Sequence, residues 1–269
     1  MRPDLATIAG ALIAAGAVVG GLLLEGGSLH DIAQYTAAII VLGGTFGAVM
    51  VSTPQRTLLS AARRLGRVLF APRVEPVALL NEIIGYAAKA RKTGLVSLEP
   101  DIETASHPFL KKALILAVDG CDLLELRKML ELERDLEESR AEADARVYEA
   151  AGGYAPTIGI IGAVLGLIQV MKRLADTEQV GHGIAVAFVA TVYGVALANL
   201  FLLPAAAKIK ARMEEETELR ELMIEGISGI VEGLNPKLIR TKLEAFAPGA
   251  AAPAPKSAPA PAGRAKEAA

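Results

Sequence analysis

The polar side chains that could carry chemistry in the apolar parts of this sequence are few and uncharged. Thr191 and Asn199 lie eight residues apart, so a helix would place them on roughly one face. A hydroxyl on that face could hydrogen-bond a carboxylate or a water that delivers an ion. The alternative is that Thr191 bonds only to a carbonyl of its own helix, as threonines in helices commonly do.

Acidic and basic side chains are missing from the same parts of the sequence. Proteins that move protons across a membrane usually keep an ionisable group inside it, because that group must bind and release the ion. Four long apolar segments of this chain contain no Asp, Glu, Lys or Arg. A conducting protein with this sequence would therefore need a titrating carboxylate from a partner. The alternative is a membrane scaffold that conducts nothing.

Two prolines stand near the ends of the last two apolar segments. In one interpretation, Pro156 and Pro204 are hinges at the cytoplasmic mouth of a channel. In the other, Pro156 is a helix-start proline and Pro204 is a tolerated kink.

The remaining reactive residues do not suggest a site. His30, His107 and His182 show no metal-ligand spacing, and no Ser, His and Asp arrangement suggests hydrolysis. We therefore expect no metal site, no cofactor and no enzymatic activity. The single cysteine, Cys121, rules out an intramolecular disulfide, and a net charge of −2 gives no indication of nucleic-acid binding.

The apolar segments are long enough to cross a bilayer core, which needs about 20 apolar residues. The chain is 52% hydrophobic with a mean hydropathy of +0.41, yet 22% of its residues are charged. Both values fit one chain because the charged residues lie in different segments from the apolar ones. A signal peptide is the rival interpretation of the first segment, but its apolar stretch is too long and a second span follows at once. The predicted spans are Leu5 to Leu24, Ala33 to Thr53, Ala150 to Met171 and Gly183 to Ala207.

Basic residues indicate which side of the membrane each loop faces. The loop from Glu25 to Ile32 contains none, and Lys172 with Arg173 is the exception at the outer end of the third span. We therefore expect both termini and the large middle segment to be cytoplasmic. The basic residues that directly follow the second and fourth spans are Arg56, Arg63, Arg64, Arg67, Lys208, Lys210 and Arg212.

Apolar residues outside the spans also recur at helical spacing, so the sequence predicts an all-α fold. One such series is Val77, Leu80, Ile84 and Ala87. We expect four transmembrane helices, with a helical cytoplasmic domain between the second and third. The predicted parts are two transmembrane helices in residues 1–53, the cytoplasmic domain in 54–149, two transmembrane helices in 150–207, a cytoplasmic helical extension in 208–246, and a disordered Ala/Pro-rich tail in 247–269.

Small residues line the predicted spans, and small-xxx-small spacing lets helix backbones approach closely, which suits tight helix association or a subunit assembly. Together these residues predict a packed bundle. The glycines are Gly10, Gly16 and Gly20 in the first span, Gly43, Gly44 and Gly47 in the second, and Gly159, Gly162 and Gly166 in the third.

The last two spans carry a distinctive pattern. Pro156-Thr-Ile-Gly-Ile-Ile-Gly-Ala-Val-Leu-Gly-Leu167 is followed by Gly183-Ile-Ala-Val-Ala-Phe-Val-Ala-Thr-Val-Tyr-Gly194, then by Asn199 and Pro204. With Ala90-Arg-Lys-Thr-Gly-Leu-Val-Ser-Leu-Glu99 and Gly233-Leu-Asn-Pro236, this pattern resembles the flagellar motor stator subunits of the MotA and PomA family. That family belongs to the MotA/TolQ/ExbB proton channel superfamily. The likeness extends from about residue 5 to residue 245.

The resemblance implies a bacterial inner-membrane protein of motility and chemotaxis. Its copies would form a ring in the lipid, thought to be a pentamer, around a dimer of a MotB- or PomB-like partner. That partner would supply the membrane aspartate and anchor the unit to peptidoglycan. Ion flux through the assembly would drive the rotor, which is contacted through the protein FliG. The residues that the resemblance assigns are Arg91, Lys92 and Glu99 at the rotor contact, and Pro156, Ala163, Thr191 and Pro204 at the ion path and its gate.

The coupling ion follows from one position in the third span. Sodium-type members of the family carry a threonine where this sequence has Ala163, and proton-type members carry an alanine. Sodium needs several oxygen ligands to replace its water, so the missing hydroxyl favours protons. Pro100 follows Glu99 where some relatives carry a second acid, which leaves the outer part of the rotor contact open.

Two alternatives to a stator subunit remain. ExbB and TolQ, which energise outer-membrane transport or envelope maintenance, look like three-span proteins with one helix before the cytoplasmic loop. Two closely spaced spans precede that loop here. The other alternative, a non-conducting scaffold, would show no ion flux with or without a partner.

Overall fold

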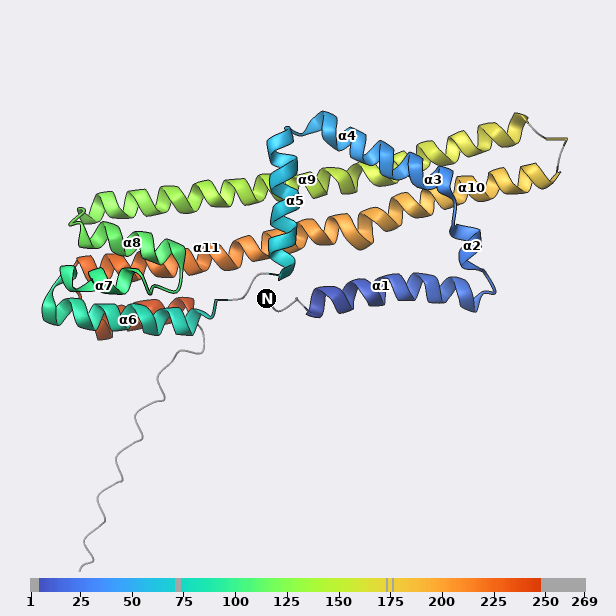
Figure 1. Ribbon diagram of the computed structural model, residues 1–269. Helices are drawn as coiled ribbons and strands as arrows, with labels where there is room; N and C mark the ends of the chain where they lie inside the picture. Colours follow the sequence, from blue (N-terminus) through green and yellow to red (C-terminus); the bar gives the residue numbers. More distant parts are fainter. Residues whose placement is uncertain (1–4, 71–73, 173, 176, 248–269) are drawn as a thin grey trace, which may run out of the picture. The chain divides into compact units, whose positions relative to one another are not determined.

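The protein is described here by a computed structural model that covers residues 5–70, 74–172, 174–175 and 177–247. These residues form helices joined by turns and contain no β-strand, so the predicted all-α fold is confirmed (Figure 1). They divide into two compact units. Residues 5–70 and 131–218 form the first unit, and residues 74–130 and 219–247 form the second. The predicted domain boundaries stay predictions, and residues 248–269 of the predicted tail lie outside the described residues.

The first unit contains the apolar helices. Among the residues that the structure describes, four helices are long and apolar enough to cross a membrane, as predicted, and their apolar windows lie within Thr7–Leu24, Tyr35–Ser52, Leu123–Lys172 and Gly183–Val231. Short π-helical segments, Ile39–Gly43 and Leu197–Leu202, interrupt the second and fourth spans. The helices are α1 (Leu5–Leu24), α2 (Leu29–Ile32), α3 (Tyr35–Ala38), α4 (Gly44–Ser52), α5 (Gln55–Phe70), α10 (Thr177–Ala196), and the parts of α9 (Leu123–Lys172) and α11 (Leu203–Val231) that belong to this unit.

The second unit is a small helical domain with its own apolar core. Its main buried residues come from α6, α8, the first turns of α9, the last turns of α11, and α12. Its elements are α6 (Pro76–Thr93), a 3-10 turn (Leu95–Leu98), α7 (Glu99–Ile102), α8 (Pro108–Val118), α12 (Pro236–Leu243) and a 3-10 turn (Glu244–Phe246).

The buried face of α6 differs from the predicted series at one end. Leu80 and Ala87 are buried as expected, but Val77 is exposed, and Ile83 is fully buried instead. The reason is close packing against α11, where a Cβ added at Gly226 would lie 2.7 Å from Cγ2 of Ile83. This contact turns the inner face of α6 toward Ile83.

The run Gly233-Leu-Asn-Pro236 is a helix-to-helix turn. Gly233 has a φ of 74°, a left-handed conformation that favours glycine, and it ends α11. Asn235 then accepts a hydrogen bond from the backbone N–H of Lys237 at 3.1 Å, and Pro236 occupies the first turn of α12. Gly233, Asn235 and Pro236 therefore each have a local structural reason.

Candidate functional site

The third and fourth spans, in α9 and α10, contact each other through their backbones. A Cβ added at Gly194 would lie 2.5 Å from the carbonyl oxygen of Ala155, and one added at Gly159 would lie 2.9 Å from that of Ala190. Further along the pair, a Cβ at Gly166 would meet Ala187 at 3.0 Å. Small residues at these positions are therefore required for the two helices to pack this closely.

The other predicted glycines divide into two groups. Gly44 packs against Ile158 of α9, where an added Cβ would lie 2.8 Å from Cγ2. Gly162 is also packed, since an added Cβ would lie 2.9 Å from the Cβ of Ala190. The other five glycines have open surroundings in this chain, with no described atom outside their own helix backbone within 4 Å of an added Cβ, so their part in a packed bundle stays a prediction. These are Gly10, Gly16 and Gly20 in α1, and Gly43 and Gly47 in the second span.

Thr191 lies in the α9–α10 contact, where its Cα would be 3.4 Å from a Cβ added at Gly159. Its hydroxyl donates to the carbonyl of Ala187 at 3.4 Å, which is a long hydrogen bond to its own helix. Asn199 is exposed and donates to the carbonyl of Val195 at 3.0 Å. Both polar groups are therefore tied to their own helix, and Thr191 is the one that also borders α9.

The two prolines and Ala163 occupy different positions. Pro156 lies inside α9, so the helix-start interpretation is wrong, because the helix runs unbroken from the charged segment into the span. Pro156 and Ala163 flank Gly159 at helical spacing, which puts them near the level of Thr191. Pro204 is the second residue of α11, directly after the π-helical segment, and is exposed.

Two polar features near this contact were not singled out from the sequence. The hydroxyl of Tyr193 donates to the carbonyl of Ile32 and accepts from the backbone N–H of Gln34, so it ties α10 to the start of the second span. Thr45 is 4% exposed, and its hydroxyl has no hydrogen-bond partner among the described residues. A lone threonine in an apolar run gives no sequence signal that its hydroxyl will be buried.

The predicted rotor-contact residues lie together in the second unit. Arg91 and Lys92 are in the last turn of α6, and Glu99 opens α7. Between them, Gly94 has a φ of 86°, which reverses the chain. All three charged side chains are exposed, and none pairs with another residue that the structure describes.

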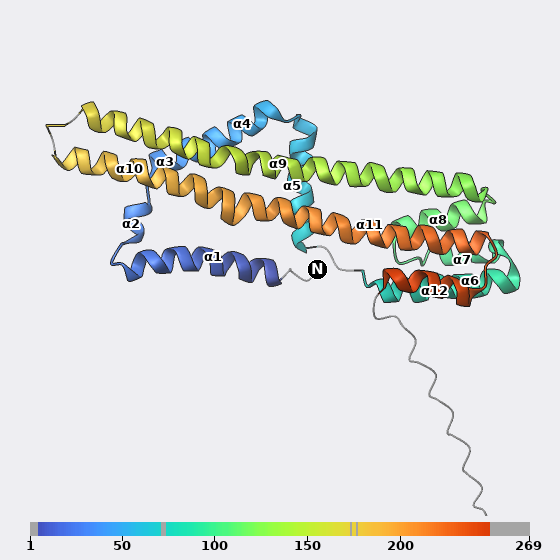
Figure 2. The same cartoon turned by 180° about the vertical axis from the view of Figure 1, so that it is seen from behind.

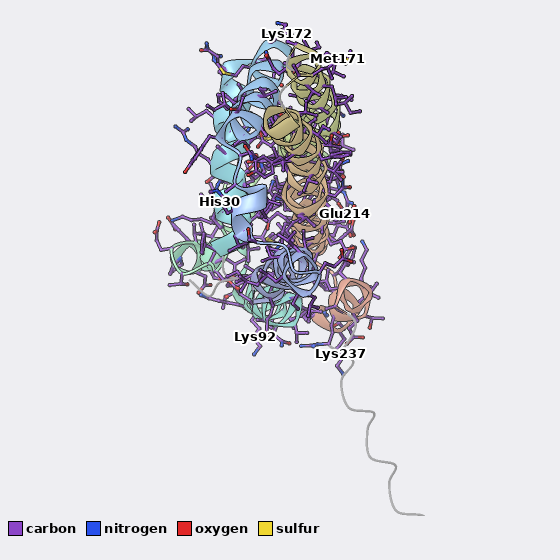
Figure 3. The ribbon with its side chains drawn as sticks, turned by 90° about the vertical axis from the view of Figure 1, so that its right-hand side faces the viewer. His30, Lys92, Met171, Lys172, Glu214 and Lys237 are labelled. Carbon is purple, nitrogen blue, oxygen red and sulfur yellow. The ribbon has the colours of Figure 1, made fainter. Side chains whose placement is uncertain are left out.

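The turn that carries these charges is held by a salt bridge that the sequence did not reveal. Nζ of Lys89 lies 2.7 Å from a carboxylate oxygen of Asp101, which joins α6 to α7. Lys92 lies at the margin of its unit with its side chain directed away from the helices (Figure 3). The α6–α7 turn, held by this salt bridge, therefore exposes two cations and one anion, which suits an electrostatic contact with another protein.

A partly buried charge cluster, with Asp144 at its buried end, fixes α5 against α9 in the first unit. Arg64 lies 2.6 Å from Asp144 and 2.8 Å from Glu137, and Ser60 donates to Asp144 at 2.9 Å. Burial acts to lower the pKa of Arg64, but the hydrogen bonds to both carboxylates outweigh it, so that pKa is raised and the guanidinium stays charged. Arg64 therefore serves internal packing as well as the basic surface predicted there.

A second charge cluster holds α12 in the second unit. Glu225 of α11 forms salt bridges with Arg127 of α9 and Lys242 of α12. Burial would raise the pKa of the Glu225 carboxyl, but hydrogen bonds from Lys242 and Arg127 lower it below its usual value. The carboxylate is therefore charged when the protein is folded at neutral pH.

Comparison with known proteins gives consistent matches along the chain. A family model described as "MotA/TolQ/ExbB proton channel family" matches residues 101–222, and one described as "Motility protein A N-terminal" matches residues 8–93. The chain is similar to motility protein A of Bacillus subtilis (strain 168), with 36% identity over 249 residues and 91% of each chain covered.

Two solved structures share the fold. One described as "Structure of C. jejuni MotAB" has a TM-score of 0.86 at 31% identity, covering 90% of this chain and 95% of that chain. One of the flagellar MotAB stator complex from Bacillus subtilis has a TM-score of 0.81 at 36% identity, covering 88% and 93%.

Proposed function

Because this chain belongs to the MotA family of flagellar motor stator subunits, within the MotA/TolQ/ExbB proton channel family, we propose that it conducts protons together with a MotB-like partner. The chain is a multi-pass inner-membrane protein of the bacterial flagellar motor. An ExbB- or TolQ-type subunit is disfavoured, since a motility-protein model matches residues 8–93, where two spans precede the middle segment.

One observation carries the partner requirement. The predicted spans contain no Asp, Glu, Lys or Arg, and the polar groups Thr191 and Asn199 are hydrogen-bonded to their own helix. A proton therefore finds no titrating group in the spans of this chain. The partner's membrane aspartate would accept a proton from one side and release it to the other, and Thr191 with Ala163 and the two prolines would line that path.

Protons are proposed as the coupling ion because of Ala163. This half-buried side chain offers no oxygen atom next to the α9–α10 contact. A sodium ion passing there would lack a ligand that sodium-type relatives are expected to provide. A proton needs only a hydrogen-bonded water or the partner's carboxylate.

The exposed charges Arg91, Lys92 and Glu99 are proposed to contact the rotor protein FliG. Their support is geometric, since they share one turn of the second unit and have no partner among the described residues. The proposed assembly is a pentameric ring around the partner, with both termini in the cytoplasm. Open surroundings at the α1 glycines are compatible with such a ring.

The test is proton uptake into vesicles that contain this chain with and without a one-span MotB-like partner. We expect flux only with the partner, and loss of that flux when the partner's membrane aspartate is changed to Asn. Flux from this chain alone would overturn the partner requirement. The absence of flux with a correctly assembled partner would favour the scaffold.

A further inference from the structure

The helix α5 carries four arginines and no acidic residue, and the protein uses only one of them internally. Arg64 is bound by Asp144 and Glu137. The other three, Arg56, Arg63 and Arg67, are exposed and pair with no residue that the structure describes. Their spacing puts them on one stripe of the helix.

A second stripe of α5 is apolar and also uncovered in the described chain. Leu59 is 53% exposed and Phe70 is 48% exposed, and helical spacing puts both directly beside the arginine stripe. The helix therefore has one side packed on the protein and an outward side on which a basic and an apolar stripe are neighbours. A helix with a basic stripe beside an exposed apolar stripe is the pattern of segments that lie in a membrane interface.

The position of α5 in the first unit agrees with that pattern. The second span ends at Ser52 in α4, and α5 begins at Gln55 after only Thr53 and Pro54. Within this unit, α5 runs across α9 and α11 and not along them (Figures 1 and 2). A helix that starts where one span ends, and that crosses α9 at Glu137 and Asp144 in the charged stretch just before the next span, lies at the level of the membrane surface.

Contacts with α9 fix which way the arginines face. Besides the Arg64 cluster, the hydroxyl of Tyr148 donates to the carbonyl of Ala61 at 3.2 Å, and Ala61 is buried. These contacts hold the inner side of α5 against α9. The basic and apolar stripes are consequently held outward before any ligand binds.

We propose that α5 binds anionic phospholipids of the adjacent leaflet, with Arg56, Arg63 and Arg67 holding the phosphate headgroups and Leu59 and Phe70 contacting the acyl chains. Guanidinium groups bind phosphate by paired N–H donors, and each basic residue near an anionic bilayer adds binding. The membrane provides this occupant at the place where α5 lies. A second copy of the chain would have to match three uncompensated cations with acidic side chains.

The experiment measures the preference of the purified full-length chain for spin-labelled phosphatidylglycerol over phosphatidylcholine. The test variant is Arg63→Gln/Arg67→Gln, and the control is Lys128→Gln/Lys237→Gln, which removes the same charge from exposed positions of the second unit. We expect the preference to fall about fivefold for each arginine removed and to weaken with salt. The control should keep the parent's preference.

A third variant separates headgroup binding from packing. Arg63→Lys/Arg67→Lys retains the charge and should keep most of the preference for phosphatidylglycerol. An unchanged preference in the Gln variant would overturn the proposal. The proposal would also be overturned if the Gln variant changed its oligomer size in bilayers of phosphatidylcholine only, because this side of α5 would then contact another copy of the chain. Proton flux with the partner is measured separately, so failure of the lipid proposal leaves the proposed function untouched.

Discussion

Thr191 is the residue at which the ion-path and structural interpretations differ most clearly. Its hydroxyl makes a long bond to Ala187, while its backbone borders Gly159 of α9. Thr191→Val keeps the shape and removes the hydroxyl, so we expect normal membrane abundance but impaired rotation, with partial function in Thr191→Ser. Tethered-cell rotation measures this effect.

The matched control is Thr157→Val. Thr157 donates to the carbonyl of Tyr154 at 2.8 Å, so it has the same kind of bond to its own helix, but it is exposed. We expect normal rotation from this variant. If both valine variants rotate like the parent, Thr191 is only a helix-bonded threonine.

The charges on the α6–α7 turn give the second residue-scale prediction. Salt bridges between exposed groups contribute about 1 kcal/mol or less each, so neutralising Arg91, Lys92 or Glu99 alone should slow swimming only partly. Reversing Arg91 and Glu99 together should slow it more, at unchanged membrane abundance. Lys128→Glu is the control, since Lys128 is exposed elsewhere in the same unit. Equal swimming speed in all of these strains would contradict the proposal that these charges contact the rotor.

At the scale of elements, the α9–α10 contact depends on glycine. Gly194→Ala places a Cβ against the carbonyl of Ala155, so the helices must separate, and we expect a loss of about 1–3 kcal/mol of unfolding free energy. Gly20→Ala in α1 meets open space and should be neutral or slightly stabilising. Thermal unfolding of the detergent-solubilised chain measures both variants, and equal melting temperatures would contradict the packing argument.

The Glu225 cluster predicts a pH-dependent attachment of α12. Because the folded-state pKa of Glu225 is lowered, its stabilisation is fully present above the unfolded pKa of about 4.5 and is lost as pH falls through the folded pKa. Glu225→Gln should cost about 2 kcal/mol at pH 7 and progressively less below pH 4.5. Hydrogen exchange in α12, compared with that of Glu232→Gln at each pH, measures the difference. A cost that does not change with pH would refute the charge assignment.

Local patterns explain why the elements were predictable and their contacts were not. Unbroken apolar runs reveal spans such as Leu5–Leu24, because apolarity is a property of neighbouring residues. The Arg64–Asp144 pair joins residues 80 apart, so no local pattern shows it. Pro156 stands near the start of an apolar run, which leaves a helix-start interpretation open in the sequence, yet the helix continues through it. The glycines of α1 and α9 look alike in sequence and differ only in what lies beside them.

For the whole molecule, the prediction concerns the coupling ion. Each elementary charge that crosses the membrane releases about 2.3 kcal/mol per 100 mV, whichever ion carries it. The membrane potential therefore does not select the ion, and the groups that line the path must select it by binding. With Ala163 in the third span, swimming should collapse with a protonophore and be indifferent to replacing sodium with potassium. A speed that follows external sodium and is blocked by phenamil would overturn the proton assignment.

The π-helical segment Leu197–Leu202 determines where the fourth span tolerates a change in its length. A π-turn holds one residue more than an α-turn, and each residue rotates a helix by about 100°. Removing one residue from such a turn leaves an ordinary α-turn, so the helix on both sides keeps its neighbours. The segment separates Gly194, which faces Ala155, from Pro204 in α11. The fourth span can therefore lose one residue here without rotating either half, whereas one residue lost between Ala187 and Gly194 would turn the small residues away from α9.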